Sequence, residues 1–184
     1  MPFLLDSYYH IYNRSINREP LFFSFANYTY FLKLYKQKVS PHVNTLAYCL
    51  LPNHFHLLIE IPNNANIELL NNGFRSLFIS YSQAINKQQG RHGSLFCKPF
   101  KRKRIDSNEY LSHVIAYIHQ NPQLHGLIEN FRDYKWSSYS SIISDAHTLL
   151  DRPKVLDWFG GKEQFIDFHE SMLNIKELDL NNEF

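Results

Sequence analysis

The sequence has few of the features that mark disulfide-rich, zinc-bound or membrane-spanning proteins. It contains only two cysteines, Cys49 and Cys97, and no Cys-x-x-Cys pair, so it indicates neither a disulfide framework nor a structural zinc site. A reducing cytoplasm is the simplest setting for such a chain. No segment reaches the roughly 18 apolar residues that a membrane helix needs, and the N-terminus, MPFLLDSYYH, lacks the basic region and apolar run of a signal peptide. We therefore expect a cytoplasmic protein with no membrane partner.

An excess of one charge is also missing, because the formal net charge of the 184 residues is only +2. This balance does not argue for nucleic acid as a partner, although a local basic patch still could. Apolar and aromatic residues are plentiful instead, since 44% of the chain is hydrophobic and 16% is aromatic. The composition excludes an intrinsically disordered chain and predicts one folded domain with a sizeable core.

The spacing of apolar residues predicts alternating strands and helices. Strands are expected at residues 8–16, 43–50, 54–61 and 94–105, and helices at residues 24–39, 66–89, 108–120 and 162–175. Gly73 interrupts the pattern of the second helix, and Asn121-Pro122 is expected to end the third. The first six elements match a split βαβ arrangement, so the predicted fold class is α+β, an antiparallel sheet with helices on one face. The last residues, KELDLNNEF, are expected to form a frayed acidic tail.

The most informative stretch is AYCLLPNHFHLLIEIP at residues 47–62, which is apolar except for a few polar residues that include His54 and His56. Because side chains alternate across a strand, the two histidines point to one face, while the apolar residues between and after them point to the other. Two imidazoles at neighbouring positions of one face suit a divalent cation. The His-x-His spacing alone is also compatible with one imidazole that bonds the backbone and one that is solvated, and a metal site still needs a third ligand.

The third predicted helix, NEYLSHVIAYIHQNP, supplies a candidate nucleophile. At roughly 100° per residue, Tyr117 lies about 110° from the centre of the apolar stripe, on a flank that it shares with His113 and Asn121. A tyrosine there lies at the boundary between core and solvent, where it either faces a groove or packs its ring and wets its hydroxyl. The stripe itself consists of Leu111, Val114, Ile115 and Ile118.

Together these residues point to phosphoryl-transfer chemistry. A phenol with an ordinary pKa near 10 is a poor nucleophile at neutral pH. A divalent ion held by His54, His56 and a carbonyl oxygen would polarise a phosphodiester and position its phosphorus for in-line attack by Tyr117. The product would be a covalent phosphotyrosine, which conserves the bond energy for a later rejoining step.

Several segments of the chain carry a resemblance to a known family, and they occur in the family's order over about residues 8–141. They are YHIYNRSINREPLFF, LPNHFHLLIE, GRHGSLFCKPFKRKRI, YIHQNP and YKWSSYSS. With these segments the chain resembles the single-tyrosine HUH transposases, which include the transposases of the smallest insertion sequences and the REP-associated tyrosine transposases. The HFH tripeptide is modest by itself, whereas HFH, the intervening segment and YIHQNP in this order are highly specific.

The resemblance implies a ferredoxin-like fold and cleavage of single-stranded DNA beside a hairpin, which leaves a 5′-phosphotyrosine and a free 3′-hydroxyl. In this family the two HUH histidines bind Mg²⁺ or Mn²⁺ and the tyrosine is the nucleophile, which implies these roles for His54, His56 and Tyr117. A polar residue one helical turn after the tyrosine completes the metal site in relatives, and that position is Asn121 here. Other candidate third ligands are His119, Gln120 and Glu60.

Basic residues cluster in the segment KPFKRKR at residues 98–104. On an extended segment, alternate side chains would face one surface and form a basic stripe, which binds phosphates without sequence preference. A solvated edge strand protected by lysine and arginine is the alternative. Including two residues at the end of the first strand, the candidate DNA-binding residues are Arg14, Arg18, Lys98, Lys101, Arg102, Lys103 and Arg104.

Three functions are compatible with these residues: strand transfer through Tyr117, non-catalytic binding of hairpin DNA, and a metal-dependent phosphoesterase in which water attacks. The completeness of the motif set favours the first. The expected partner is single-stranded or hairpin DNA, bound by a monomer or by a homodimer that exchanges the tyrosine helix.

We assign the transposase-like domain to residues 1–141 and a C-terminal helical extension to residues 142–184. The sequence leaves open the role of this extension, the target hairpin, and whether the gene is mobile or domesticated.

Overall fold

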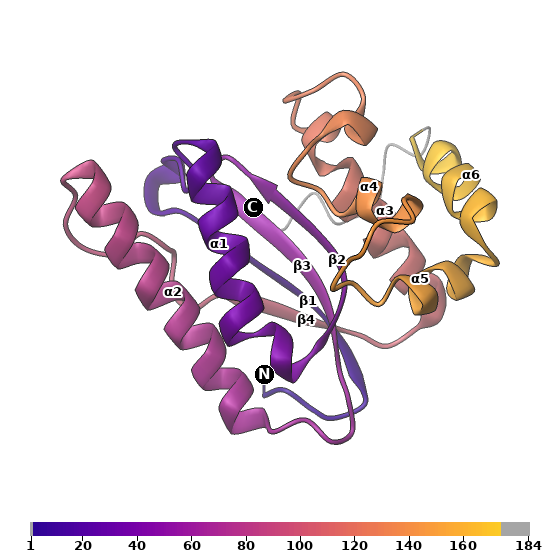
Figure 1. Ribbon diagram of the computed structural model, residues 1–184, viewed down its shortest axis with the longest axis horizontal. Helices are drawn as coiled ribbons and strands as arrows, with labels where there is room; N and C mark the ends of the chain where they lie inside the picture. The colour runs from indigo at the N-terminus through magenta and orange to yellow at the C-terminus, as the bar shows by residue number, and fades with distance from the viewer. Residues whose placement is uncertain (1, 174–184) are drawn as a thin grey trace.

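The structure, a computed structural model, describes residues 2–173 and is built around a four-stranded antiparallel sheet. The strands lie in the order β2-β3-β1-β4 (Figure 1). This order and the element sequence β1-α1-β2-β3-α2-β4 confirm the predicted ferredoxin-like, split βαβ fold. The strands are β1 (Ser7–Arg14), β2 (Asn44–Leu51), β3 (His54–Ile61) and β4 (Lys101–Ile105).

Two long helices, α1 (Phe25–Lys38) and α2 (Ile67–Gln89), cover one face of the sheet (Figure 1). Alternate apolar residues of β3, among them Phe55 and Leu57, pack against them in a fully buried core. The prediction that Gly73 interrupts α2 is wrong, since the helix continues through it. A Cβ at this position would lie 2.1 Å from the carbonyl oxygen of Lys38, so glycine allows α1 and α2 to approach closely.

A third helix, α3 (Asn108–Leu124), covers the opposite face of the sheet. Its apolar stripe packs on the side chains that β2 and β3 direct to that face, including Leu46 and Leu58. The helix does not end before Pro122 as predicted, because the proline falls in its last turn, where it removes only one helical hydrogen bond. The turn is closed instead by the amide of His125, which donates to the carbonyl oxygen of Asn121 at 3.0 Å.

The fourth strand is shorter than the predicted extended segment of residues 94–105, and only Lys101–Ile105 forms it. Pro99 lacks the amide hydrogen that a continuous ladder requires. The preceding residues still follow the end of β1, where the amide of Cys97 donates to the carbonyl oxygen of Arg14 at 2.9 Å. The first strand itself ends at Arg14 rather than at residue 16, and the 3-10 turn Ile16–Arg18 follows it.

The C-terminal part of the described chain contains three helices, of which only the last was predicted. They are α4 (Tyr139–Ile143), α5 (Arg152–Phe159) and α6 (Lys162–Met172), with 3-10 turns at Ser40–His42 and Phe131–Asp133 elsewhere. The predicted boundary between residues 141 and 142 falls inside α4, and the predicted acidic tail lies outside the described residues. Among residues 2–173, no helix is long and apolar enough to cross a membrane.

Backbone hydrogen bonds connect the segment 136–151 to the edge of β2 that no other strand of the described chain pairs with. The amide of Ser138 donates to Tyr48 and that of Asp151 to Thr45, both at 2.9 Å. Leu50 donates in turn to the carbonyl oxygen of Trp136 at 2.9 Å. Since an uncovered edge strand invites pairing with other chains, these contacts protect β2 as well as position α5 and α6 against α3.

Candidate active site

The two histidines of β3 lie on the face of the sheet that α3 covers. The ring centroids of His54 and His56 are 5.3 Å apart, and both side chains are buried. Their cross-strand neighbours on β1 are Arg14 and Tyr12, respectively. The alternation of β3 therefore directs both imidazoles away from the α1–α2 core and toward the tyrosine helix.

The helix α3 brings Tyr117 and Asn121 to the same histidines. The ring centroid of Tyr117 lies 5.6 Å from that of His56, in an edge-to-face arrangement. One helical turn later, the Oδ1 atom of Asn121 lies 3.4 Å from Nε2 of His54. Residues four apart share one side of a helix, so a single surface of α3 supplies both groups.

The hydrogen bonds of His54 determine which ring nitrogen is available. Its Nδ1 atom lies 2.7 Å from Oδ1 of Asn53, an oxygen that can only accept, so Nδ1 carries the proton. Nε2 lies 3.4 Å from Oδ1 of Asn121, and in the tautomer with the proton on Nδ1 it is Nε2 that has the lone pair a cation needs. An imidazole nitrogen and an amide oxygen this close together are both of the types that could bind one divalent cation.

Both histidines are held in the neutral form that a metal ligand requires. Burial, with a smaller contribution from the nearby His125, lowers the pKa of His54 to about 4. Burial also lowers the pKa of His56 well below its usual value, with contributions from neighbouring His10 and His54. Because a protonated imidazole has no lone pair to offer, the neutral form is the one that a metal ligand would need.

The donor set fits Mg²⁺ or Mn²⁺ through two imidazoles and one carboxamide oxygen. Oxygen ligands suit both ions, and imidazole together with oxygen suits Mn²⁺ in particular. Within residues 2–173, no group of three or more histidine, cysteine, aspartate or glutamate side chains forms a metal-binding cluster. The third protein ligand in this part of the chain would therefore be the amide of Asn121 rather than a carboxylate.

The other candidate third ligands point elsewhere. The carboxylate of Glu60 bonds Lys154, Asn44 and Tyr8 at the far end of β3. His119 and Gln120 turn toward α6, where His119 Nδ1 lies 2.9 Å from His169 Nε2 and the Gln120 amide donates to the His169 carbonyl oxygen at 2.7 Å.

Two aromatic residues beside the histidines were missed by the sequence analysis. Nε2 of His10 lies 2.9 Å from Nδ1 of His56, and the Tyr12 ring is stacked on His56 with centroids 6.0 Å apart. The signal was the alternation in YHIYNR, which puts His10, Tyr12 and Arg14 on one face of β1. It carries no information about which strand lies next to β1, and that pairing brings the two histidines together.

The basic residues of β4 divide between the two faces of the sheet. Lys101 lies opposite Tyr12 and Lys103 opposite His10, so both belong to the histidine face. The guanidinium of Arg102 lies instead over the Phe3 ring at 4.5 Å and the Phe100 ring at 5.3 Å. Arg104, also on that other face, forms an ion pair with Asp106 at 2.6 Å. Of the four cations of β4, Lys101 and Lys103 therefore share the histidine face, whereas Arg102 and Arg104 lie on the other.

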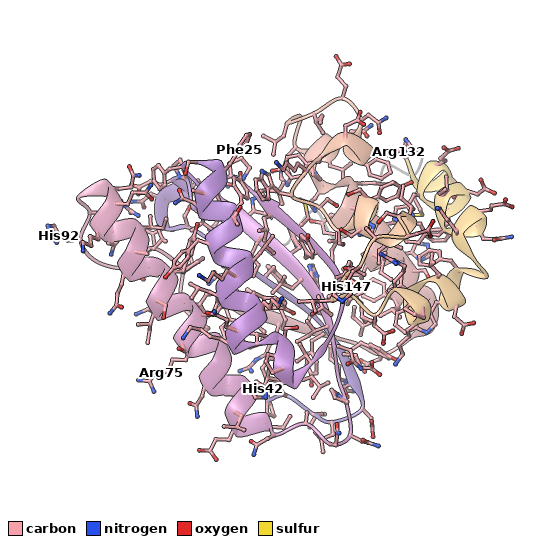
Figure 2. All side chains as sticks on the ribbon, in the orientation of Figure 1. Phe25, His42, Arg75, His92, Arg132 and His147 are labelled. Carbon is pink, nitrogen blue, oxygen red and sulfur yellow. The ribbon has the colours of Figure 1, made fainter. Side chains whose placement is uncertain are left out.

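The remaining predicted DNA-binding residues lie near the ends of the strands. Arg14 is the cross-strand neighbour of His54, and Arg18 ends the 3-10 turn after β1. Lys98 lines a groove of about 820 Å³ between α2 and residues 93–100. Arg75 lines the same groove and projects outward from α2 (Figure 2).

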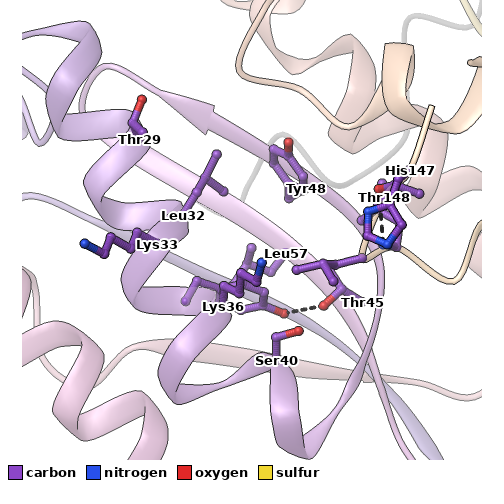
Figure 3. A pocket seen from close by; sticks show the side chains of 13 residues that line it. Thr29, Leu32, Lys33, Lys36, Ser40, Thr45, Tyr48, Leu57, His147 and Thr148 are labelled. Carbon is purple, nitrogen blue, oxygen red and sulfur yellow. Dashed lines mark hydrogen bonds between the residues drawn. The ribbon is translucent and has the colours of Figure 1, made fainter.

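A separate cavity of about 460 Å³ lies between α1, β2 and the segment 147–150 (Figure 3). Its floor includes a buried hydrogen bond between the hydroxyls of Tyr35 and Thr45 at 2.8 Å. Lys33 and Lys36 line it from α1, and His147 lines it from the C-terminal segment. None of the four grouped residues, His54, His56, Tyr117 and Asn121, lines this cavity, so it is distinct from the candidate active site.

Comparisons with known proteins show what the chain is similar to. Over 117 residues the chain is 30% identical to a candidate REP-associated tyrosine transposase of Haemophilus influenzae, a match that covers 59% of this chain and 66% of that protein. The fold is similar to a solved structure described as a REP-associated tyrosine transposase bound to a REP hairpin, with a TM-score of 0.63 and 14% sequence identity. That similarity covers 82% of this chain and 92% of the solved one.

The family profile described as "Transposase IS200 like" matches residues 4–121. This range contains the whole sheet and ends at Asn121, so it includes all four residues that the fold groups around His54. Because the match covers more than half of the chain, the protein belongs to the IS200-like transposase family.

Proposed function

We propose that the protein is a metal-dependent DNA strand transferase that cleaves and rejoins single-stranded DNA next to hairpins through Tyr117. The observation that carries this proposal is the grouping of four side chains within one chain. The Tyr117 ring lies 5.6 Å from the His56 ring, and Asn121 faces His54 at 3.4 Å. A nucleophile beside a set of neutral metal ligands is the arrangement that phosphoryl transfer requires.

In the proposed cleavage step, the Oη atom of Tyr117 attacks the phosphorus of the scissile phosphodiester. An O–P bond to tyrosine forms, and the bond between phosphorus and the 3′ oxygen breaks. The phenol loses its proton, and the departing 3′ oxygen gains one to become a free 3′-hydroxyl. A 3′-hydroxyl that later attacks the 5′-phosphotyrosine rejoins the DNA and restores Tyr117. The number of phosphodiester bonds is conserved, so no external energy source is needed.

His54, His56 and Asn121 would hold Mg²⁺ or Mn²⁺, which supplies Lewis-acid polarisation of the phosphate. The protein contributes the orientation of the reacting groups. The stacked rings of Tyr12 and His56 and the packing of α3 on the sheet fix where the Tyr117 ring lies. A positioned nucleophile lowers the barrier because its motional freedom is lost during folding rather than during reaction.

We propose single-stranded or hairpin DNA as the substrate, bound on the histidine face. Arg14 beside His54 and Lys101 beside Tyr12 supply positive charge on that face, which suits the phosphates on either side of a cleavage site. A hairpin is supported by the structurally similar protein, whose solved structure contains a REP hairpin.

The proposal is tested by incubating the protein with labelled single-stranded DNA that contains hairpins from the gene's own flanks. With Mg²⁺ or Mn²⁺, we expect a covalent protein–DNA band on a denaturing gel, and none after Tyr117→Phe or His54→Ala. Tyr117→Phe should still bind the DNA on a native gel, because the ring packing is kept. Binding without a covalent band from the wild type would indicate a non-catalytic hairpin binder. Hydrolysis that survives Tyr117→Phe would indicate attack by water, and either result contradicts the proposal.

A further inference from the structure

Nδ1 of His56 is in contact with a second imidazole. Nε2 of His10, on the neighbouring strand β1, lies 2.9 Å from it, and both side chains are fully buried. The rings are stacked, with centroids 5.1 Å apart and an interplanar angle of 20°. Cross-strand pairing holds His10 beside β3, opposite Leu58 and two residues from the His56 register. The contact is thus built into the centre of the sheet.

A hydrogen bond between two neutral imidazoles needs one ring to donate and the other to accept, and only one direction is compatible with a metal on His56. If His10 donated through Nε2–H, Nδ1 of His56 would accept and the proton of His56 would be on Nε2. That nitrogen would then have no lone pair for a metal. If His56 donates through Nδ1–H, its Nε2 carries the lone pair that a metal ligand needs.

We propose that His10 is a positioning residue that accepts the Nδ1–H of His56 and so fixes the tautomer in which Nε2 of His56 binds the metal. The inference rests on the proposed metal-dependent function. Metal-binding histidines in proteins usually donate their second ring N–H to an acceptor that fixes ring orientation, most often a carboxylate or a carbonyl. In this chain a histidine takes that place.

The second histidine ligand has an equivalent acceptor, which supports the assignment. His54 Nδ1 lies 2.7 Å from Oδ1 of Asn53, so each candidate ligand has its Nδ1 atom occupied by a neighbouring side chain. The two acceptors come from different parts of the fold, since Asn53 precedes β3 and His10 lies on β1. Both ligands are thereby set to bind through Nε2.

Aromatic side chains prevent the two rings from rotating away from each other. The Tyr12 ring lies 5.0 Å from the His10 ring on the same strand. The Tyr117 ring stands edge-on to both imidazoles, 6.3 Å from His10 and 5.6 Å from His56. His10 therefore connects the strand pairing of the sheet to the orientation of the metal ligand beside the nucleophile.

The test compares His10→Gln, which keeps an acceptor near the position of Nε2, with His10→Leu, which fills similar space without one. Mn²⁺ affinity is measured by isothermal titration calorimetry on the full chain without DNA. We expect His10→Leu to weaken Mn²⁺ binding about 10–100-fold, the usual effect of removing such an acceptor, and His10→Gln to stay within about threefold of the wild type. Wild-type affinity in a folded His10→Leu variant would overturn the proposal.

Two further measurements keep the test decisive. If His10→Leu does not fold, the wild-type ¹⁵N–¹H spectrum of the histidine rings still determines the tautomer: a proton on Nδ1 of His56 supports the proposal, and one on Nε2 overturns it. His56→Ala separates the inference from the proposed function. If that variant binds Mn²⁺ as well as the wild type, the metal site itself is wrong, whereas loss in His56→Ala without loss in His10→Leu contradicts only the role of His10.

Discussion

At the scale of single residues, the candidate site depends on a carboxamide where a carboxylate would be the more obvious metal ligand. Asn121 Oδ1 faces His54 Nε2 at 3.4 Å, and its amide nitrogen donates to the Tyr117 carbonyl oxygen at 3.5 Å. The side chain therefore links His54 to the backbone of Tyr117. The resemblance to the family implied this residue, one helical turn after Tyr117, and the fold places it beside His54, whereas the alternatives at 60, 119 and 120 point elsewhere.

We predict that Asn121→Leu weakens Mn²⁺ binding at least about tenfold, because it removes one of the three proposed protein ligands. Asn121→Asp should bind Mn²⁺ at least as tightly as the wild type, since it keeps the oxygen and adds a negative charge. Calorimetric titration of the two variants distinguishes a ligand from a packing residue. Equal weakening in both variants would mean that the oxygen is not a ligand.

At the scale of secondary-structure elements, strand alternation determines which side chains of β3 and β4 face the histidine side of the sheet. The sequence predicted the faces of β3 correctly because one face is almost entirely apolar. The segment from Lys98 to Arg104 has cations at both odd and even positions, so its sequence does not distinguish one face from the other. Only the pairing of β4 with β1 reveals which cations lie near the histidines. Helices α4 and α5 were missed because they are short, with 5 and 8 residues, and a helical period needs a longer window.

Lys101 and Arg102 are adjacent in sequence but should behave differently. Lys101 is exposed on the histidine face, so Lys101→Ala should weaken hairpin-DNA binding. It should also reduce the steepness with which log affinity falls with log salt concentration by about 1. Arg102 lies over Phe3 and Phe100 on the other face, so Arg102→Ala should mainly lower the free energy of unfolding, by about 0.5–2 kcal/mol. Fluorescence anisotropy at several salt concentrations measures the DNA affinity of both variants, and urea denaturation measures their free energy of unfolding. The reverse pattern would contradict the assignment of faces.

The buried His169 anchors α6 to α3 and should make stability depend on pH. Burial lowers its pKa to about 4, although the bond from its ring to the Phe165 carbonyl oxygen opposes the shift. His119, Arg132 and Tyr139 face it from the surrounding elements. The unfolded chain, with a histidine pKa near 6.5, binds the proton more readily than the folded chain. The contribution of His169 to the free energy of unfolding is therefore fully present above about pH 6.5. It is lost as the pH decreases toward 4.

This dependence is measured by urea denaturation between pH 7.5 and 4.5. We expect the free energy of unfolding to decrease with falling pH, with His169 contributing on the order of 3 kcal/mol at most. His169→Gln should flatten the profile while the other buried histidines keep part of the slope. A profile that the substitution leaves unchanged would show that His169 does not titrate in this way.

At the scale of the whole molecule, one chain contains a complete candidate site. The sheet supplies His54 and His56, α3 supplies Tyr117 and Asn121, and the segments after α3 hold that helix against its own sheet. The split βαβ fold was predictable because each element has a clear apolar period. The contact between His10 and His56 was not predictable, since it depends on the register between strands that are more than 40 residues apart in sequence.

Because the site is complete within one chain, two inactive variants should not restore each other. We predict that a mixture of Tyr117→Phe and His54→Ala proteins forms no covalent product with hairpin DNA. A homodimer that exchanges α3 would instead rebuild one intact site from the two variants. Recovery of about a quarter or more of the wild-type product would therefore contradict assembly of the site within one chain.

The central claim is that Tyr117 forms a covalent bond to the 5′ side of cleaved DNA, and intact-protein mass spectrometry tests it most directly. After incubation with a flanking hairpin oligonucleotide and Mn²⁺, the wild-type mass should increase by that of the DNA fragment 3′ of the cleavage site. Digestion and peptide sequencing should then locate a nucleotide remnant on Tyr117. An adduct on another residue, or cleaved DNA with no adduct at any time point, would contradict the account.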